Sequence, residues 1–273
     1  MARRMTTLQV RRTERLTPHM IRVVAGGDEL AAFPDTEHTD RYVKILFPAP
    51  DVSYAAPFDV EAIRRDHPRA EWPQTRTYTV RALDHAAGEL TIDFVHHGDT
   101  GVAGPWAAAA KPGDTLRLLG PGGAYAPDAA AGWHLLVGDE AALPAIAAAL
   151  QKVPDGATAR VLVQVGNADD QQELPAGPDV RVTWLHRDAT ADGGAGQLLA
   201  AVRALEFPPG RVHAFVHGEA GEVREVRRHL LGERGVDRDA LSVSGYWRRG
   251  LDEGGFRADK AAERQREQAA ATS

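Results

Sequence analysis

Two stretches in the first half of the chain combine residue types that could bind a ligand. Residues 76–81 read Arg-Thr-Tyr-Thr-Val-Arg, which alternates as a β-strand does and places an aromatic ring between arginines. Residues 97–106 read His-Gly-Asp-Thr-Gly-Val-Ala-Gly-Pro-Trp, a glycine-rich run in which Pro105 begins an alanine-rich helical stretch. Glycines let the backbone approach a ligand, and the exposed N–H groups of a helix start favour phosphate. An aromatic ring, an arginine and a phosphate cradle together suggest a flavin nucleotide.

Each stretch also has an ordinary structural interpretation. Residues 76–81 fit a barrel strand with Tyr78 in the core and the arginines in solvent, and residues 97–103 fit a plain loop. The neighbouring pair His96-His97 suggests a metal site, but adjacent side chains on a strand point to opposite faces and cannot easily share one ion. A metal site is therefore the weakest of these alternatives.

The elements that must position these stretches are short strands separated by Pro, Gly and Asp clusters, as in an antiparallel β-barrel. Six strands are predicted: Thr7–Arg12, Met20–Ala25, Tyr42–Phe47, Thr77–Leu83, Leu90–Val95 and Thr115–Leu119. The proline-rich segment from Pro48 to Trp72 is predicted to be a surface excursion with one short helix at Val60–Arg65. Long loops of this kind are usually functional or mobile.

A low-complexity stretch at residues 126–132 marks a change of pattern, after which strands and helices alternate. This is typical of a parallel sheet with crossover helices. The strands are expected at Trp133–Val137, Ala159–Val165, Val180–Leu185, Val212–Val216 and Leu241–Gly245, and the helices at Leu143–Leu150, Leu198–Leu205 and Ala220–Leu231. We therefore predict two domains, residues 1–125 and residues 126–273, with a solvated helical tail from Phe256.

Composition narrows the function further. The chain has 273 residues and a formal charge of -6, which argues against nucleic-acid binding because that normally requires a basic surface. It has no cysteine, so disulfides, zinc thiolates and cysteine-ligated iron–sulfur clusters are excluded, and redox chemistry needs a bound organic cofactor. The basic N-terminus lacks an apolar signal region and no segment is long enough to span a membrane, so a cytoplasmic protein is expected.

Four segments together resemble a known family. They are residues 76–81, His97-Gly98-Asp99, Gly138-Asp139-Glu140 with the following Ala-Leu-Pro-Ala-Ile at 142–146, and Gly-Tyr-Trp-Arg-Arg-Gly at 245–250. They look like the siderophore-interacting proteins, flavin-dependent ferric-siderophore reductases within the ferredoxin–NADP reductase superfamily. The resemblance implies a six-stranded antiparallel β-barrel that binds FAD noncovalently, followed by an α/β parallel-sheet domain that receives NADPH or NADH.

The resemblance also implies site residues in the barrel. The FAD contacts would be Arg76, Tyr78, Thr79, Val95, His97, Gly101, Val102, Ala103 and Trp106, together with Trp247 from the second domain. Tyr78 would stack on the isoalloxazine, Thr79 would reach toward the flavin N5 edge, and Arg76 would pair with the pyrophosphate through its planar fork. The family usually has a serine and a larger residue where Gly104 and Pro105 stand, so one hydroxyl contact is absent here.

In the second domain the implied donor contacts lie at strand ends. They are Gly138, Asp139, Glu140, Ala142, Arg187, Gly218 and Glu219. Gly138-Asp139-Glu140 ends the first parallel strand, where open sheets bind ligands, but acidic groups beside a phosphate are unfavourable and also fit a helix cap. Arg187 resembles a residue that holds the 2′-phosphate of NADPH and fits an exposed strand end equally well. Residues 218–221 fit a nucleotide contact or simple turn chemistry.

Ferric siderophores are often anionic, so a local basic cluster is expected in this acidic protein. Lys44, Arg248 or Arg249, and Lys260 are similar in placement to a basic triad of the family. The implied activity passes electrons from NADPH or NADH through flavin to Fe(III) in the siderophore, with iron as substrate and no resident metal; a ferredoxin is an alternative donor, and a monomer is expected. The rival hypotheses are another flavin reductase on the same scaffold and a non-catalytic siderophore-binding protein.

Overall fold

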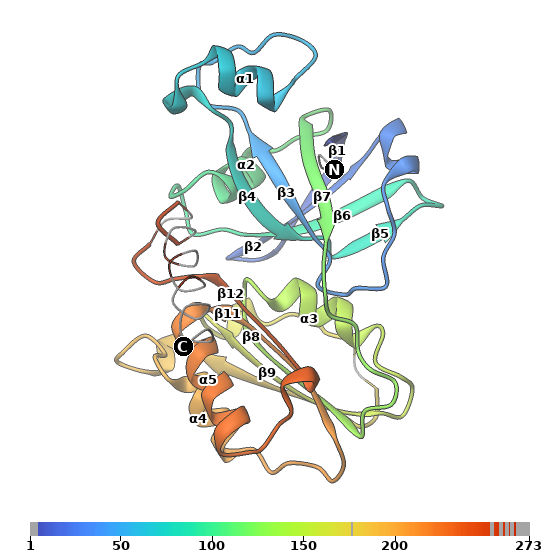
Figure 1. Cartoon of the computed structure of the whole chain (residues 1–273), viewed down its shortest axis with the longest axis vertical. Coiled ribbons are helices and arrows are strands. Elements are labelled where there is room, and N and C mark those ends of the chain that lie inside the picture. Colours follow the sequence, from blue (N-terminus) through green and yellow to red (C-terminus); the bar gives the residue numbers. More distant parts are fainter. Residues whose placement is uncertain are drawn as a thin grey trace. The chain divides into compact units, whose positions relative to one another are not determined.

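The computed structural model describes residues 5–175, 177–251, 254–256, 259, 262 and 265. The chain divides into two compact units between Ala126 and Pro127, with residues 147–149 grouped with the first. The first unit contains a seven-stranded antiparallel sheet, and the second contains a five-stranded parallel sheet with helices (Figure 1). This succession confirms the predicted fold class.

The first unit is built from strands that pair in the order β4-β3-β7-β1-β2-β6-β5. Their bounds are β1 (Met5–Thr17), β2 (Met20–Gly26), β3 (Tyr42–Phe47), β4 (Gln74–Thr79), β5 (Ala82–Asp84), β6 (Glu89–Val95) and β7 (Thr115–Gly122). Two short helices accompany them, α1 (Val60–Asp66) and α2 (Ala103–Ala109). The inward-facing residues form one hydrophobic core that includes Leu8, Val23, Ile45, Ile92 and Leu118.

The two edge strands of this sheet are consecutive in the chain, and their connection closes the barrel. Val80 donates its N–H to the Arg41 carbonyl at 2.7 Å, and Arg81 donates to the Thr91 carbonyl at 2.8 Å. These two residues carry the chain from the β3 side of the sheet to the β6 side. The expected single strand Thr77–Leu83 is therefore divided into β4 and β5, which gives seven strands instead of six.

Strand β1 is longer than the sequence pattern predicted, because its polar second half also pairs. Register shifts at Val10/Arg12 and Arg15/Thr17 let this half follow β2 to their shared turn. Residues 11–15 of this half are exposed, and Arg12 forms an ion pair with Glu89. Exposed pairing of this kind leaves little hydrophobic signal in the sequence.

The proline-rich excursion between β3 and β4 is organised around α1, close to its expected position. Asp59 caps the helix by accepting from the N–H groups of Glu61 at 2.9 Å and Ala62 at 3.3 Å. The Tyr54 hydroxyl accepts from the Ala49 N–H and donates to the Glu71 carbonyl, joining the two ends of the excursion.

The second unit has the strand order β10-β9-β8-β11-β12, with every adjacent pair parallel. The strands are β8 (Trp133–Asp139), β9 (Thr158–Val165), β10 (Val180–His186), β11 (Val212–Glu219) and β12 (Leu241–Trp247). The helices are α3 (Leu143–Leu150), α4 (Gln197–Ala204) and α5 (Ala220–Gly232). Short 3-10 helices occur at Asp28–Ala32, Arg69–Glu71, Ala168–Asp170, Arg187–Ala189 and Arg238–Ala240.

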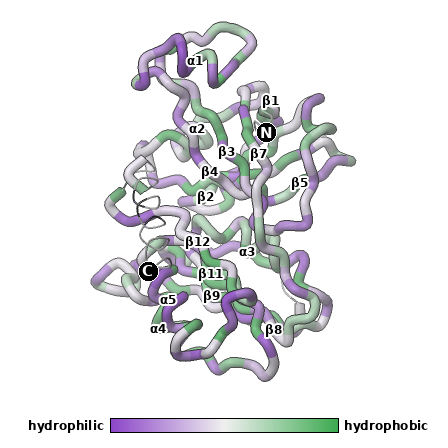
Figure 2. Tube along the Cα trace, viewed as in Figure 1, coloured by the Kyte–Doolittle hydropathy of each residue, from purple (hydrophilic) through white to green (hydrophobic). Residues whose placement is uncertain are grey.

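The burial of β8 on both faces of the sheet explains why its sequence is a nearly continuous apolar run. It is the central strand and every one of its residues is buried, whereas the edge strand β10 has only half-buried and exposed residues. One core cluster joins β8 and β11 to α4 and α5 through residues such as Trp133, Val216 and Val226. Helix α3, between β8 and β9, is coloured hydrophobic along its length in Figure 2.

Candidate functional site

Tyr78 lies on β4 at the edge of the barrel sheet, and its ring is only partly buried. It contacts the Phe94 ring of β6 with centroids 4.5 Å apart, and Phe94 contacts the Trp106 ring of α2 at 5.6 Å. Phe94 is fully buried, while Trp106 is also partly exposed. The three rings form a continuous aromatic cluster that connects the barrel core to its surface at Tyr78.

The loop between β6 and α2 exposes its backbone. Gly98 and Gly101 have φ values of 65° and 82°, a left-handed conformation that favours glycine, and no heavy atom lies within 4 Å of a Cβ built on either. Thr100 stabilises the turn by donating its hydroxyl to the His97 carbonyl at 3.0 Å. Residues 97–101 are exposed, so these glycines serve the path of the backbone and not close packing.

Gly104 has a different reason to be glycine. A Cβ at this position would lie 3.0 Å from the Val95 carbonyl oxygen and 3.4 Å from the His96 Cα. Its absence lets the first turn of α2 pack directly against the end of β6. The structure thereby brings Val95, Val102 and Ala103 of the predicted FAD set together, and it gives the unusual Gly104 a packing explanation.

Strand register determines which predicted residues share a face of β4. Directly opposite residues of an antiparallel pair project to the same side, so Tyr78 lies beside Val43, Arg76 beside Ile45, and Lys44 beside Thr77. Tyr78 and Arg76 therefore share one face, and Lys44 projects to the other. The Arg76 guanidinium donates to the Thr75 carbonyl at 3.1 Å and to the Gln74 side-chain oxygen at 3.0 Å, both neutral acceptors. Thr79 is buried.

In the second unit, the strand order reverses between β8 and β11, the point where open parallel sheets bind ligands at their carboxyl edge. Three glycines end strands there because neighbouring atoms leave no room for a side chain. A Cβ on Gly138 would lie 2.7 Å from the His217 carbonyl oxygen, one on Gly218 would lie 2.7 Å from the Asp139 carboxylate, and one on Gly245 would lie 2.8 Å from the Ala220 Cβ. The edge is thus closely packed around Asp139.

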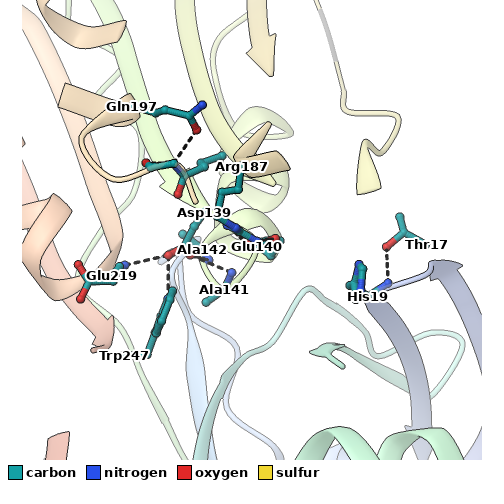
Figure 3. A network of polar contacts seen from close by, with 12 residues as sticks. Thr17, His19, Asp139, Glu140, Ala141, Ala142, Arg187, Gln197, Glu219 and Trp247 are labelled. Atoms are coloured by element: carbon teal, nitrogen blue, oxygen red, sulfur yellow. Dashed lines mark hydrogen bonds and ion pairs between the residues drawn. The ribbon is translucent and has the colours of Figure 1, made fainter. Parts of the chain in front are cut away.

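Asp139 is the centre of the polar network in Figure 3. One carboxylate oxygen accepts from the N–H groups of Ala141 at 2.9 Å and Ala142 at 3.3 Å. The other accepts from the Glu219 N–H at 2.8 Å and from the Trp247 indole N–H at 2.7 Å. Asp139 therefore links the ends of β8, β11 and β12. Complete burial, with a contribution from the Glu140 charge, raises its pKa to about 6, although these hydrogen bonds oppose the shift.

Glu140 is buried and forms a bidentate ion pair with Arg187, one bond of which measures 2.8 Å (Figure 3). Burial alone would lower the pKa of Arg187, but the hydrogen bonds to Glu140 and the charges of Glu140, Asp139 and Asp170 raise it. Arg187 follows β10 and Glu140 follows β8, so the pair spans the carboxyl end of β9, the strand between them. Each residue was predicted as a donor contact, but their pairing was not.

The remaining predicted residues of this unit lie around the same edge. Glu219 caps α5 by accepting from the Glu222 N–H at 2.9 Å, and its other oxygen accepts from the Arg249 N–H at 3.2 Å. Trp247 is 37% exposed. Arg248 forms an ion pair with Asp259 at 2.5 Å. Lys260 lies outside the described residues. The assignments of all these residues to NAD(P)H, FAD or siderophore stay predictions.

Two polar groups at this edge escaped the sequence analysis. Gln164 is buried in β9 and donates to the Gly194 carbonyl at 2.7 Å and to the Gln197 side chain at 2.9 Å. Its signal was a lone amide in the apolar run Val161–Val165. Glu222 accepts from the Gly196 N–H at 2.5 Å, and burial raises its pKa. Its position three residues after Glu219, at a helix start, was the available signal.

The residues of the barrel fit a flavin nucleotide in chemical type. Tyr78 offers a partly exposed ring, Arg76 on the same face offers a guanidinium, and the loop of Gly98 and Gly101 offers exposed backbone. In the described part of the chain, no three His, Asp or Glu side chains gather as a metal site requires. Among the same described residues, no helix combines the length and apolar character of a membrane span.

Comparison with known proteins gives matches along almost the whole chain. The family model described as Siderophore-interacting FAD-binding domain matches residues 9–125, and the model described as Siderophore-interacting protein matches residues 131–250. The Vibrio cholerae protein named Ferric vibriobactin reductase ViuB is 32% identical, with 91% of each chain covered. The Escherichia coli protein named NADPH-dependent ferric-chelate reductase is 30% identical, with 89% of this chain and 93% of that protein covered.

Solved structures agree. A siderophore utilization protein from T. fusca has a TM-score of 0.79 and 38% identity, with 92% of this chain and 95% of that chain covered. A ferredoxin NADP+ reductase from Neisseria gonorrhoeae, 12% identical with a TM-score of 0.58, shares the fold, with 89% of this chain and 99% of that chain covered. With its barrel and its α/β unit both matched and with relatives above 30% identity across both, this chain belongs to the siderophore-interacting protein family.

Proposed function

We propose that this protein is an FAD-dependent reductase of ferric siderophores that takes electrons from NADPH or NADH and releases iron as Fe(II). The observation that carries the proposal is Tyr78, a partly exposed ring on an edge strand, in a barrel that matches a siderophore-interacting FAD-binding domain. The names of the V. cholerae and E. coli relatives supply the reaction class. A cytoplasmic monomer is the proposed setting.

The predicted FAD residues have defined tasks in this proposal. Tyr78 provides a flat surface against the isoalloxazine, and its contact with Phe94 limits the orientations of its ring. Arg76, on the same face, neutralises phosphate charge, and the N–H groups of the exposed residues 97–101 provide neutral donors. Bound FAD supplies the ability to accept a hydride as an electron pair and to pass electrons on singly.

The electron count is consistent with iron release. Each NADPH or NADH gives up a hydride, which carries two electrons, and two Fe(III) ions are reduced to Fe(II). The hard oxygen donors of a siderophore hold Fe(II) less tightly than Fe(III), so reduction releases the metal. Lys44, Arg248, Arg249 and Lys260 are the proposed docking cations for an anionic siderophore. A ferredoxin remains the alternative electron donor.

The test is the visible spectrum of the purified protein followed by anaerobic reduction. The protein should carry FAD, bleach on addition of NADPH or NADH, and regain its colour on addition of a ferric siderophore while a ferrous chelator develops absorbance. Free flavin and ferric citrate as acceptors distinguish a general flavin reductase. A protein that binds ferric siderophore but never retains FAD, or a flavoprotein that reduces none of several ferric complexes, would refute the proposal.

A further inference from the structure

The carboxyl end of β9 is where a doubly wound nucleotide domain distinguishes NAD from NADP. In such domains an acidic side chain at the end of the second strand accepts from the ribose 2′-hydroxyl, whereas an arginine accommodates a 2′-phosphate. Here β9 is the second strand of the sheet, and Asn167, Asp169 and Asp170 follow it directly. Asp169 is exposed, and its backbone N–H donates to the Asn167 side chain at 2.8 Å, which fixes the turn.

The arginine beside this end of β9 is already engaged. Both terminal nitrogens of Arg187 donate to the two carboxylate oxygens of Glu140. The Glu140 side chain is only 7% exposed and the Arg187 side chain is 22% exposed, so solvent screens the pair weakly. Asp139 and Asp170 add negative charge around the same guanidinium. A bidentate pair in this setting leaves the local charge negative.

Arg249 also has acidic neighbours, Glu222 and Asp192. Burial raises the pKa of Glu222, and the Arg249 charge opposes that rise. Hydrogen bonds from Thr190 and Gly194 lower the pKa of Asp192, and the Arg249 charge acts in the same direction. A dianionic 2′-phosphate near the end of β9 would meet the exposed Asp169 and an Arg187 that Glu140 already neutralises.

We propose that this nucleotide edge selects the donor that lacks a 2′-phosphate, so that NADH is preferred to NADPH, and that the Glu140–Arg187 pair is the specificity determinant. This inference rests on the proposed function, because it concerns the electron donor of the same reaction. It distinguishes this chain from the E. coli relative, whose name gives NADPH as its donor.

The experiment compares two ligands that differ only in the 2′-phosphate, 5′-AMP and adenosine 2′,5′-bisphosphate, by calorimetry on the FAD-loaded protein at low and high salt. Wild type should bind 5′-AMP at least about tenfold more tightly, because the added phosphate meets the exposed Asp169 and an arginine already paired with Glu140. Glu140→Gln releases Arg187 and should improve bisphosphate binding about tenfold, mainly at low salt, with little change for 5′-AMP. The rates of flavin reduction by NADH and NADPH should follow the same order.

Two further variants isolate the cause. The double variant Glu140→Gln, Arg187→Gln should lose the gain, because the released guanidinium is gone. Glu225→Gln is the matched control, since it also frees an arginine, Arg228, by removing one carboxylate from α5. It should leave both affinities unchanged.

The outcomes separate the inference from the function beneath it. If wild type binds the bisphosphate as tightly as 5′-AMP or more tightly, the proposed selectivity is wrong, while a nucleotide-dependent reductase remains possible. This comparison needs only wild type, so it tests the selectivity even if Glu140→Gln does not fold. Binding of neither ligand, with no flavin reduction by either nucleotide, overturns nucleotide donation itself and this inference with it. A gain in Glu225→Gln equal to that in Glu140→Gln would show a general charge effect and would remove the pair as the determinant.

Discussion

Replacing Asp139 with asparagine should change how the stability of the protein depends on pH. The carboxylate is completely buried, and its pKa in the folded protein is about 6 against a reference of 3.8. Between these values the folded state binds more protons than the unfolded state. Stability contributed by this group is therefore greatest at acid pH and falls as the pH rises toward and past 6.

The size of the effect follows from the two pKa values. A difference of about 2 units corresponds to about 3 kcal/mol lost when the group is ionised in both states. Only part of this change falls within a convenient window, since the unfolded state is already ionised at pH 5. From pH 5 to pH 7.5, we expect the free energy of unfolding of wild type to fall by about 1.4 kcal/mol relative to Asp139→Asn.

The assay is urea unfolding of both proteins across that range, analysed as the difference between them at each pH, so that groups common to both cancel. An amide cannot accept from all four donors that meet Asp139, so a constant offset is also expected. The slope of the difference, not the offset, tests the reasoning. Asp155→Asn, which removes an exposed carboxylate of the same unit, should show no such slope. A difference that is flat with pH, or that rises, would refute the buried-acid account.

Three other substitutions test the barrel. Tyr78→Ala should weaken FAD binding about tenfold, measured by flavin retention on dilution, while Tyr78→Phe should keep it because the ring remains. Gly104→Ala should lower the free energy of unfolding by about 1–3 kcal/mol in urea, because its Cβ would lie 3.0 Å from the Val95 carbonyl oxygen; Gly232→Ala, with open space around it, should not. Lys44→Ala should raise the apparent Michaelis constant for an anionic ferric siderophore about threefold at low salt and less at high salt. The control Lys111→Ala, which removes an exposed lysine, should leave that constant unchanged. Equal Michaelis constants in wild type and both variants would show that Lys44 takes no part in docking.

Elements with a strong hydrophobic periodicity could be predicted, because this periodicity is visible within a short stretch of sequence. The parallel strands and α3, α4 and α5 lie close to their expected positions, since buried strands and one-sided helices have distinct hydrophobic spacing. The division at Val80 and Arg81 was not predictable, because both residues fit an extended strand and only barrel closure turns the chain there. The second half of β1 was missed because most of its side chains, at residues 11–15, are exposed.

The sequence by itself determined the redox class of this protein. An arginine and tyrosine on one alternating strand, a glycine run before a helix and the absence of cysteine are local properties, and they point to a flavin. The nicotinamide donor was inferred from the resemblance of residues 138–146 and 245–250 to the family. Only the tertiary structure decided what Glu140 and Arg187 do. They stand 47 positions apart on either side of β9, so their pairing depends on the order of the strands in the sheet. Glu140 neutralises Arg187 only because their side chains lie close together in the folded protein, and the linear sequence does not give that distance.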